Sequence, residues 1–326
     1  MAEEKQASGR KPFKTMIGGQ ALIEGIMMIG PDRKAVVVRK PDGTLEEQVS
    51  DRVLIKDKYP LLGLPFLRGI FNFGSSMANG VKALMFSAEF YGGDEGEEEP
   101  SRFERFLEEK LGSEKLSSLI VTLAVILGMA FSVGLFILLP TAVVGGIGWL
   151  FSGMPMWVRN VLEGLVRIVI FGGYLILCSK TKDIHRVFQY HGAEHKTIFC
   201  YEAGLPLTVE NVRKQPRHHP RCGTSFLFVV IVTAILLSSI VFSFVALTAP
   251  LARMGVHLLL LPVVVGLTYE LNRLVGRYDN AVTRLLTAPG LWLQNFTTFE
   301  PDDSMIEVGI RAFTLVLPEE KGKDAW

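Results

Sequence analysis

Four long apolar stretches dominate the pattern of hydrophobic and polar positions along the chain. They cover residues 116–139, 157–178, 226–247 and 254–275. A helix crosses the roughly 30 Å hydrocarbon core of a bilayer in about 20 mostly apolar residues, and each stretch has about that length. The first and third stretches contain no charged residue. The pattern therefore predicts a mainly α-helical, polytopic membrane protein with about four transmembrane helices.

Charged residues interrupt the other two stretches at informative positions. Glu163 and Arg167 stand four residues apart, so on a helix they share one face and can form an ion pair inside a bundle. Glu270 lies near the expected cytosolic end of the last stretch, where an unpaired carboxylate is costly. We expect Glu270 either to pair with Arg273 or Arg277, or to serve as a metal ligand.

The segment before the first stretch has a different periodicity. Residues 34–39 and 46–54 alternate between apolar and polar side chains around the turn sequence Pro41-Asp42-Gly43, which predicts a small N-terminal β-hairpin region. Residues 61–90 then carry apolar side chains at helical spacing, which predicts an amphipathic helix on the membrane or beside the bundle. Because 69–81 is uncharged, a fifth span is the alternative.

These patterns organise the chain into successive segments. Pro140 is expected to end the first span, and the Gly-rich residues after it to form a non-cytosolic loop or a short re-entrant segment. The segments are a cytosolic β-rich part at 1–60, the amphipathic helix at 61–91, an acidic linker and short helix at 92–115, transmembrane helices 1–2 at 116–178, a cytosolic His-rich loop at 179–225, transmembrane helices 3–4 at 226–275 and a cytosolic helical part at 276–326.

Composition supports the membrane assignment and excludes two other classes of protein. The 326 residues are 49% hydrophobic, and the mean hydropathy is +0.32. The 34 Lys and Arg nearly balance the 33 Asp and Glu, so no bulk positive charge favours a nucleic-acid partner. Three cysteines cannot form a disulfide scaffold, and we expect them to be reduced.

The distribution of positive charge predicts an orientation. Residues 179–225 carry eight Lys and Arg, whereas 140–156 carries none and the turn before the last span carries only Arg253. The positive-inside rule then places the 179–225 loop and both termini in the cytosol. The first residues lack an apolar signal-peptide core. The predicted location is the cytoplasmic (inner) membrane of a bacterium, with the lipid bilayer as the first partner.

The candidate chemistry is concentrated in the His-rich loop, which holds five of the six histidines. His191 and His195 are four residues apart, so on a helix both imidazoles leave the same face, as a divalent metal requires. Glu194 between them completes an H-x-x-E-H order, in which two histidines bind zinc and the glutamate is the base. Glu202 lies eleven residues after His191 and returns to nearly the same face, as an outer ligand. The sixth histidine, His257, is expected to be a packing or interfacial residue.

A second cluster ends the loop. His219 and Cys222 are three residues apart, and a thiolate with an imidazole also suits Zn²⁺. A Cys nucleophile with a His base is the other chemical alternative. Glu24, in a Gly-rich apolar run, is a candidate further carboxylate ligand. For each cluster a purely structural role is the competing hypothesis: a hydrogen-bonded His pair, a turn that shapes the membrane entry, and a packed strand–turn around Glu24.

Several of these motifs occur together in a known pattern. They are the run GGQALIEGIMMIGP at 18–31, residues 190–195 with Glu202, and the blocks 219–226, 269–271 and 297–303. In these motifs the chain resembles the YqhQ-like bacterial membrane proteins, a family defined by domain of unknown function 1385, and the resemblance extends over residues 15–317. It implies a predicted metal-dependent enzyme of the membrane, and it names neither substrate nor reaction. The last block is expected to open an amphipathic C-terminal helix.

Two classes of function follow from the candidate site. One is a membrane-embedded zinc-dependent hydrolase in which His191, His195 and a carboxylate (Glu202, Glu270 or Glu24) hold the metal and Glu194 is the general base. Its substrate would be a membrane protein or a lipid head group. The alternative is a non-catalytic scaffold or assembly factor with a structural metal. A filled shell of His191, His195, His219 and Cys222 would favour the scaffold, and three ligands with an open position would favour the enzyme.

Overall fold

The computed structural model describes residues 13–53, 58–91, 112–151, 154–245, 250–278, 280–320 and 322–325. The predicted acidic linker and nearly all of the short helix expected after it lie outside these ranges. The chain divides into two compact units. The first unit draws on residues 1–91, 174–233 and 262–326, and the second on 92–173 and 234–261.

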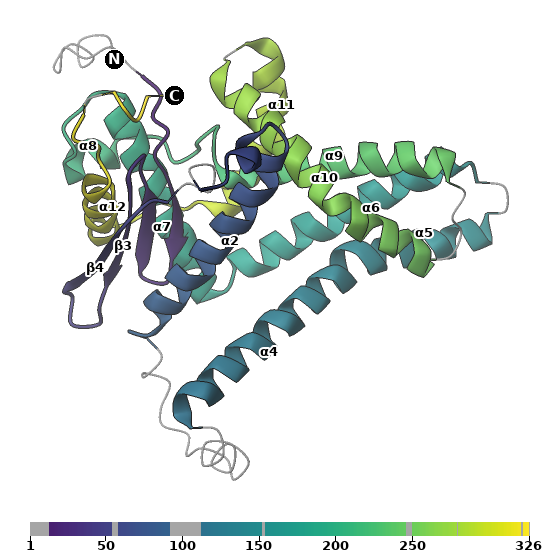
Figure 1. Cartoon of the computed structure of the whole chain (residues 1–326), viewed down its shortest axis with the longest axis horizontal. Helices are drawn as coiled ribbons and strands as arrows, with labels where there is room; N and C mark the ends of the chain where they lie inside the picture. Colours follow the sequence, from purple (N-terminus) through teal and green to yellow (C-terminus); the bar gives the residue numbers. More distant parts are fainter. Residues whose placement is uncertain are drawn as a thin grey trace. The chain divides into compact units, whose positions relative to one another are not determined.

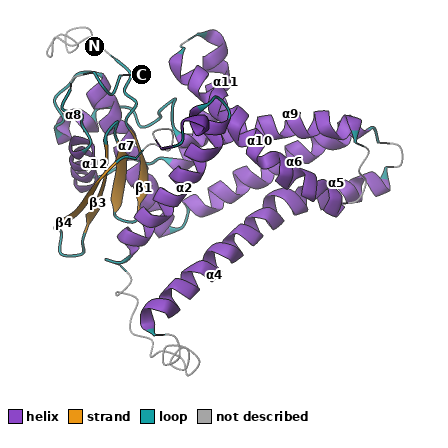
Figure 2. Ribbon diagram, viewed as in Figure 1, coloured by secondary structure: helices purple, strands orange, loops and turns teal. Residues whose placement is uncertain are grey.

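The first unit contains a four-stranded antiparallel sheet in the order β1-β2-β3-β4 (Figure 2). The strands are β1 Gly18–Leu22, β2 Gly25–Ile29, β3 Arg33–Arg39 and β4 Leu45–Asp51. The predicted hairpin is confirmed as β3–β4, and its turn places Gly43 at φ +85°, which glycine adopts without a steric penalty. The Gly-rich run at 18–31 forms the second hairpin, β1–β2, as the strand–turn alternative expected.

Helices cover both faces of this sheet (Figure 1). Alternate residues of a strand point to opposite faces, so Met28 and Val37 pack with α7 (Lys182–Glu202) and α12 (Asp303–Leu315). Met27 and Val36 pack on the other side with α2 (Leu67–Ala88). The remaining elements assigned to this unit are η2 Pro60–Gly63, α8 Val209–Arg213 and α11 Ala281–Thr297. Helix α12 is the C-terminal amphipathic helix that the sequence predicted.

Helix α2 is the amphipathic helix predicted at 61–90. Its Ala83 faces the sheet, while apolar residues such as Phe71 and Met77 remain exposed. Near its N-terminus, Gly69 allows close packing against Tyr269 of the last long helix. The part of the chain that the structure describes has four helices long and apolar enough to cross a membrane, and α2 is not one of them. The fifth-span alternative is therefore not supported.

The four predicted spans are all present. The candidate spans cover Thr122–Leu150, Met156–Ser179, Gly223–Phe244 and Leu251–Arg277. The helices that form them are α4 Ser113–Val133, η3 Gly134–Leu138, α5 Leu139–Leu150, α6 Met156–Ser179, α9 Gly223–Phe244 and α10 Pro250–Arg277. The predicted fold class, a mainly helical polytopic membrane protein with a small N-terminal sheet, is confirmed.

The prediction that Pro140 ends the first span was wrong. The chain passes through η3, a π-helical turn, and continues as α5 through the Gly-rich residues expected to form a loop. A proline lacks the N–H that would pair with a carbonyl one turn earlier, and Arg167 compensates because its Nε–H donates to the Phe136 oxygen at 2.8 Å. A side-chain donor thus satisfies the backbone within the apolar bundle, where an unpaired carbonyl is costly.

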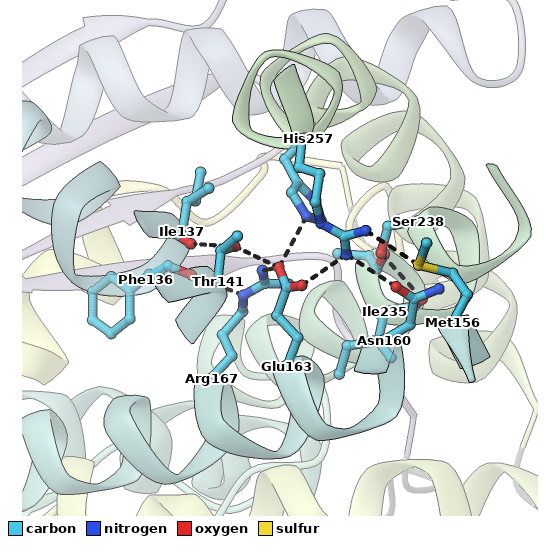
Figure 3. Close-up of polar contacts among 12 residues, drawn as sticks. Phe136, Ile137, Thr141, Met156, Asn160, Glu163, Arg167, Ile235, Ser238 and His257 are labelled. Carbon is cyan, nitrogen blue, oxygen red and sulfur yellow. Dashed lines mark hydrogen bonds and ion pairs between the residues drawn. The ribbon is translucent and has the colours of Figure 1, made fainter. Parts of the chain in front are cut away.

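The second unit buries a polar network among its helices (Figure 3). The predicted pair is present, with Arg167 Nη2 3.4 Å from Glu163 Oε1. Two predictions nearby need correction. Arg253 lies inside α10 rather than in a turn and donates to Glu163 Oε2 at 2.8 Å. His257 is more than a packing residue, because its Nε2 lies 3.3 Å from Glu163 Oε1.

Candidate metal centre

Helix α7 places His191 and His195 side by side. The helix runs unbroken over Lys182–Glu202, so residues four apart share a face, and the two imidazole centroids are 4.4 Å apart. Most residues of α7 from Tyr190 to Ile198 are buried. The predicted helical register of the H-x-x-E-H motif is therefore confirmed.

Gly192, inside this motif, lets another segment pack directly on the helix backbone. A Cβ atom at this position would lie 2.0 Å from the carbonyl oxygen of Phe299, far inside van der Waals contact. The Phe299 N–H donates to the Phe188 oxygen at 3.0 Å. The chain after α11 is thereby fixed against the side of α7 that carries His191.

A tight turn brings Cys222 to the same place. The Cys222 N–H donates to the His219 oxygen at 3.2 Å, and helix α9 begins at the next residue. Gln294 of α11 anchors this turn at both backbone groups of His219: its Oε1 accepts the N–H at 2.7 Å and its Nε2 donates to the carbonyl at 2.8 Å. Gln294 is fully buried.

His191, His195 and Cys222 together form a potential metal-binding group. Each offers one ligand atom, and these atoms lie within 4.8 Å of one another. Of these atoms, His191 Nε2 and Cys222 Sγ are 3.1 Å apart. Two imidazole nitrogens and a thiolate are ligands that Zn²⁺ prefers.

The hydrogen bonds of the two imidazoles prepare them to bind a metal. His191 Nδ1 lies 2.7 Å from the Thr297 oxygen, and His195 Nδ1 lies 2.5 Å from the Arg217 oxygen. A carbonyl oxygen only accepts, so each Nδ1 carries a proton, and in the neutral imidazole the Nε2 presents a lone pair to a metal. Metal-binding histidines are characteristically held in this way. His195 Nε2 is buried without a hydrogen-bond partner among the described residues, so these residues fit a metal ion.

The electrostatics of the group favour the thiolate. Burial alone would raise the pKa of the Cys222 thiol, but the neighbouring His191 and His195 outweigh it and hold that pKa well below its usual range. Burial acts on His191 in the opposite direction, yet contact with Cys222 raises the pKa of His191 to about 9. A deprotonated thiol is the form of cysteine that binds metals.

Glu194 lies beside this group at the wall of a cavity of about 180 Å³. The cavity is also lined by residues 15–19, by His195 and by Cys222. Glu194 is only 5% exposed, and its Oε1 accepts the Gly19 N–H at 3.0 Å. Burial raises the pKa of Glu194 above its usual value, although the neighbouring His191 and His195 act in the opposite direction.

Two predicted ligands, His219 and Glu202, form a separate cluster, of which His219 lines the cavity. The Glu202 carboxylate forms an ion pair with Arg221 and accepts the Thr15 N–H at 2.7 Å. His219 Nε2 is 4.0 Å from Glu202, and burial holds the pKa of His219 well below its usual value. The structure therefore does not group His219 or Glu202 with the three potential ligands.

The other two candidate carboxylate ligands, Glu24 and Glu270, have partners outside the three-residue group. Glu24 pairs with Arg186 and accepts the Tyr190 hydroxyl at 3.1 Å. Glu270 pairs with Arg68 of α2, a residue far away in the sequence, instead of the expected Arg273 or Arg277. The ion-pair alternative for Glu270 thus holds with a different partner, and neither carboxylate joins the three-residue group.

Sequence reasoning missed the residues that support the site. Gln294, Thr297 and Phe299 act through one amide side chain and two backbone carbonyls, and backbone groups leave no signal in a sequence. Gln294 does leave one, because it and Asn295 are the two polar residues of the otherwise apolar segment 291–296. Gly192 leaves another, as a glycine inside a helical motif.

Comparison with known proteins agrees with this arrangement of motifs. The model of the family described as "Protein of unknown function (DUF1385)" matches residues 64–319. The chain belongs to the DUF1385 family. It is 39% identical over 307 residues to the uncharacterized protein YqhQ of Bacillus subtilis (strain 168), and the match covers 92% of each chain. No solved structure matches. His191, Glu194, His195 and Cys222 lie within the DUF1385 match, whereas residues 15–19 of the cavity wall precede it.

Proposed function

We propose that this chain is a metal-dependent hydrolase that acts at the membrane surface. The observation that carries the proposal is the pair of histidines whose Nδ1–H groups are tied to carbonyls, leaving both Nε2 lone pairs beside the Cys222 thiol. His191, His195 and Cys222 would hold the metal, for which zinc is the best match. The bound ion supplies Lewis acidity and lowers the pKa of water that it coordinates.

Glu194 is the proposed general base. Its Oε1 is fixed by the Gly19 N–H, which orients the carboxylate along the cavity wall and leaves Oε2 to take a proton from a water in the cavity. Its raised pKa also lets it return that proton to a leaving group. The Gly19 contact requires close approach, since a side chain at position 19 would meet the Glu194 carboxyl carbon at 3.0 Å.

The ligand count favours a catalytic site over a structural one. Structural zinc sites are characteristically closed by four protein ligands, whereas catalytic sites keep a position open. His219, the fourth member of the predicted closed shell, faces Glu202 and Arg221 instead. A cavity lies next to the three remaining ligands. These features support an enzyme over a scaffold.

A Cys nucleophile activated by a His base is the second candidate. It is favoured by the 3.1 Å distance between His191 Nε2 and Cys222 Sγ and by the lowered pKa of Cys222. This alternative leaves His195 unexplained, because a second buried imidazole with an unpartnered Nε2 has no role in such a pair. Metal binding accounts for all three residues, so we prefer it.

The position of Cys222 limits the substrate. Helix α9, a candidate membrane span, starts immediately after it, so the cavity lies at the end of a span. Substrates within reach are peptide bonds of membrane proteins and lipid head groups. The charge of the 179–225 loop further supports a cytosolic site, with both termini on the same side of a bacterial cytoplasmic membrane.

The decisive experiment measures bound metal in detergent-purified protein. We expect about one zinc per chain in the wild type and a loss of zinc in the double variant His191→Ala/His195→Ala. Asp183→Ala is the control, because Asp183 is exposed on the same helix outside the three-residue group, and it should retain the metal. Wild-type protein without metal, even after expression with added zinc, would refute the metal proposal.

Glu194→Gln separates the enzyme from the scaffold. The amide keeps the size of the side chain and removes its capacity to take a proton. We expect full zinc content with loss of hydrolysis, measured on vesicles that carry a panel of phospholipids and membrane-anchored peptides. In the organism, a Glu194→Gln allele that functions like the wild type while retaining its zinc would identify a structural metal.

A further inference from the structure

The candidate membrane spans of the second unit contain more cations than anions. Within the described part of these spans the charged side chains are three arginines, Arg159, Arg167 and Arg253, and one carboxylate, Glu163, so the formal excess is two positive charges. These residues belong to the candidate spans that start at Met156 and Leu251. Uncompensated charge within such helices is expensive and characteristically marks a functional site.

Glu163 has no capacity to neutralise all three. Its Oε1 already accepts the Thr141 hydroxyl at 2.6 Å and lies within 3.4 Å of both Arg167 Nη2 and His257 Nε2. Its Oε2 accepts Arg253 Nη2 at 2.8 Å. Both carboxylate oxygens of Glu163 are therefore already occupied by the partners drawn in Figure 3.

Arg159 stands outside this closed network. Its guanidinium forms no ion pair with any described carboxylate, and its Nε is buried without a hydrogen-bond partner. It lies beside Gly145 of α5, where a Cβ atom would be 3.6 Å from Arg159 Nη2. Arg159 is half-buried, and an unpaired guanidinium within a candidate membrane span is costly unless an anion compensates it.

The other unpartnered groups have the same polarity. Asn160 Nδ2 and Arg253 Nε are, with Arg159 Nε, the buried side-chain polar atoms of the described second unit that lack a partner. All three are N–H donors, and none is an acceptor. A cluster deficient in acceptors and rich in positive charge has the chemistry to bind an anion.

The depth of Arg159 identifies the kind of anion. Arg159 is the fourth residue of α6, which places its Cα about 5 Å along the helix from Met156 at 1.5 Å per residue. Such a position at the end of a span lies close to the headgroup region of a bilayer, where phosphate groups are abundant. A guanidinium binds phosphate through two parallel hydrogen bonds.

We propose that the end of the second unit formed by the starts of α6 and α10 binds a phosphate group, carried by an anionic phospholipid, with Arg159 as its principal ligand. Asn160 and Arg253 offer further N–H donors from the same two helix starts. Glu163 holds Arg253 in place and so positions this ligand-binding side chain without itself contacting the phosphate.

Arg159→Gln is the informative variant. Arg159 has no ion-pair partner in the described chain, so its removal leaves every contact of Glu163 intact and should not unfold the bundle. Removing Arg253 instead would leave Glu163 without its 2.8 Å partner and confuse binding with folding. Arg277→Gln is the matched control, because Arg277 is the exposed last residue of α10.

The test measures binding of phosphatidylglycerol to the detergent-purified full chain by native mass spectrometry, with phosphatidylcholine and inorganic phosphate in parallel. We expect the wild type and Arg277→Gln to retain about one phosphatidylglycerol, and Arg159→Gln to bind it at least tenfold more weakly with an unchanged circular dichroism spectrum. Arg159→Lys, which keeps the charge and loses the two-pronged geometry, should be intermediate. Binding of inorganic phosphate that depends equally on Arg159 would support the phosphate site and identify a free anion as its ligand. Equal retention of phosphatidylglycerol by Arg159→Gln and wild type, or of phosphatidylcholine and phosphatidylglycerol by the wild type, would overturn the proposal.

Discussion

Replacing Gly192 with alanine should push helix α7 away from the segment 297–299, which supports His191. The added Cβ would lie 2.0 Å from the Phe299 oxygen, whereas ordinary contact begins near 3.4 Å. The two backbones must therefore separate by about 1.4 Å, or the Phe299 peptide must rotate and lose its hydrogen bond to Phe188. A surrounding backbone cannot give way as a flexible side chain can.

The change in the free energy of unfolding caused by Gly192→Ala follows from two opposing contributions. Overpacking in a well-packed region costs about 1–3 kcal/mol, and alanine returns up to about 1 kcal/mol of helix propensity relative to glycine. The net expectation is a destabilisation of about 1–2 kcal/mol. For a folding unit of this size that corresponds to an apparent Tm roughly 2–8 °C lower.

The same change should reach the candidate metal centre. Phe299 is two residues from Thr297, whose oxygen holds His191 Nδ1 at 2.7 Å. Loss of such a supporting contact characteristically lowers metal affinity about 10–100-fold. Gly192→Ala should therefore lose zinc to a chelator at concentrations that leave the wild type loaded.

The assay is thermal unfolding of the detergent-purified proteins at one scan rate, with zinc measured on the same samples. Gly74→Ala is the control, since Gly74 lies inside helix α2 and a Cβ there meets nothing within 4 Å. It should keep or slightly raise the Tm. A Gly192→Ala protein with wild-type Tm and wild-type zinc retention would refute the inferred packing of Phe299 on α7.

Three further predictions concern the surroundings of the site. Cys222 should be alkylated by iodoacetamide only after a chelator has removed the metal, while Cys200, whose pKa burial raises to about 11, should stay unmodified with and without chelator. Mass spectrometry of the digested protein measures the labelling of both cysteines. Equal labelling of Cys222 with and without chelator would contradict metal ligation. Gln294→Ala should cost about 1–3 kcal/mol because it leaves both backbone groups of His219 without their partners, whereas Asn295→Ala should cost less, as compared by Tm. In a double-mutant cycle on Arg68 and Glu270, a coupling of about 1–3 kcal/mol is expected for this paired, partly buried contact; a coupling near zero would show that the pair contributes nothing.

The sequence predicted those features that depend on local periodicity. Span positions follow from apolar length, and the β3–β4 hairpin follows from alternation around a turn. The register of His191, Glu194 and His195 follows from helical spacing alone. Each of these depends on residues that lie close together in the chain, so a single sequence contains the necessary information.

The features that were mispredicted or missed depend on contacts between distant segments. Pro140 is tolerated within a continuing span because Arg167, 27 residues later, supplies the missing donor. Glu270 takes Arg68 in preference to cations on its own helix. The anchoring of the Cys222 turn by Gln294 likewise depends on how α11 packs, and spacing along the chain does not encode it.

The wall of the cavity has a consequence for the order of events during synthesis. Residues 15–19 line it, and Thr15 is held by a hydrogen bond from its hydroxyl to Asp324 at 2.7 Å and by a bridge to Ala325. The remaining walls come from α7 and from the start of α9. A ribosome must therefore release residues 309 positions apart before Thr15 gains this anchor. The candidate centre is completed only after all four spans have been translated, so a partly inserted nascent chain carries the histidines but not the finished cavity.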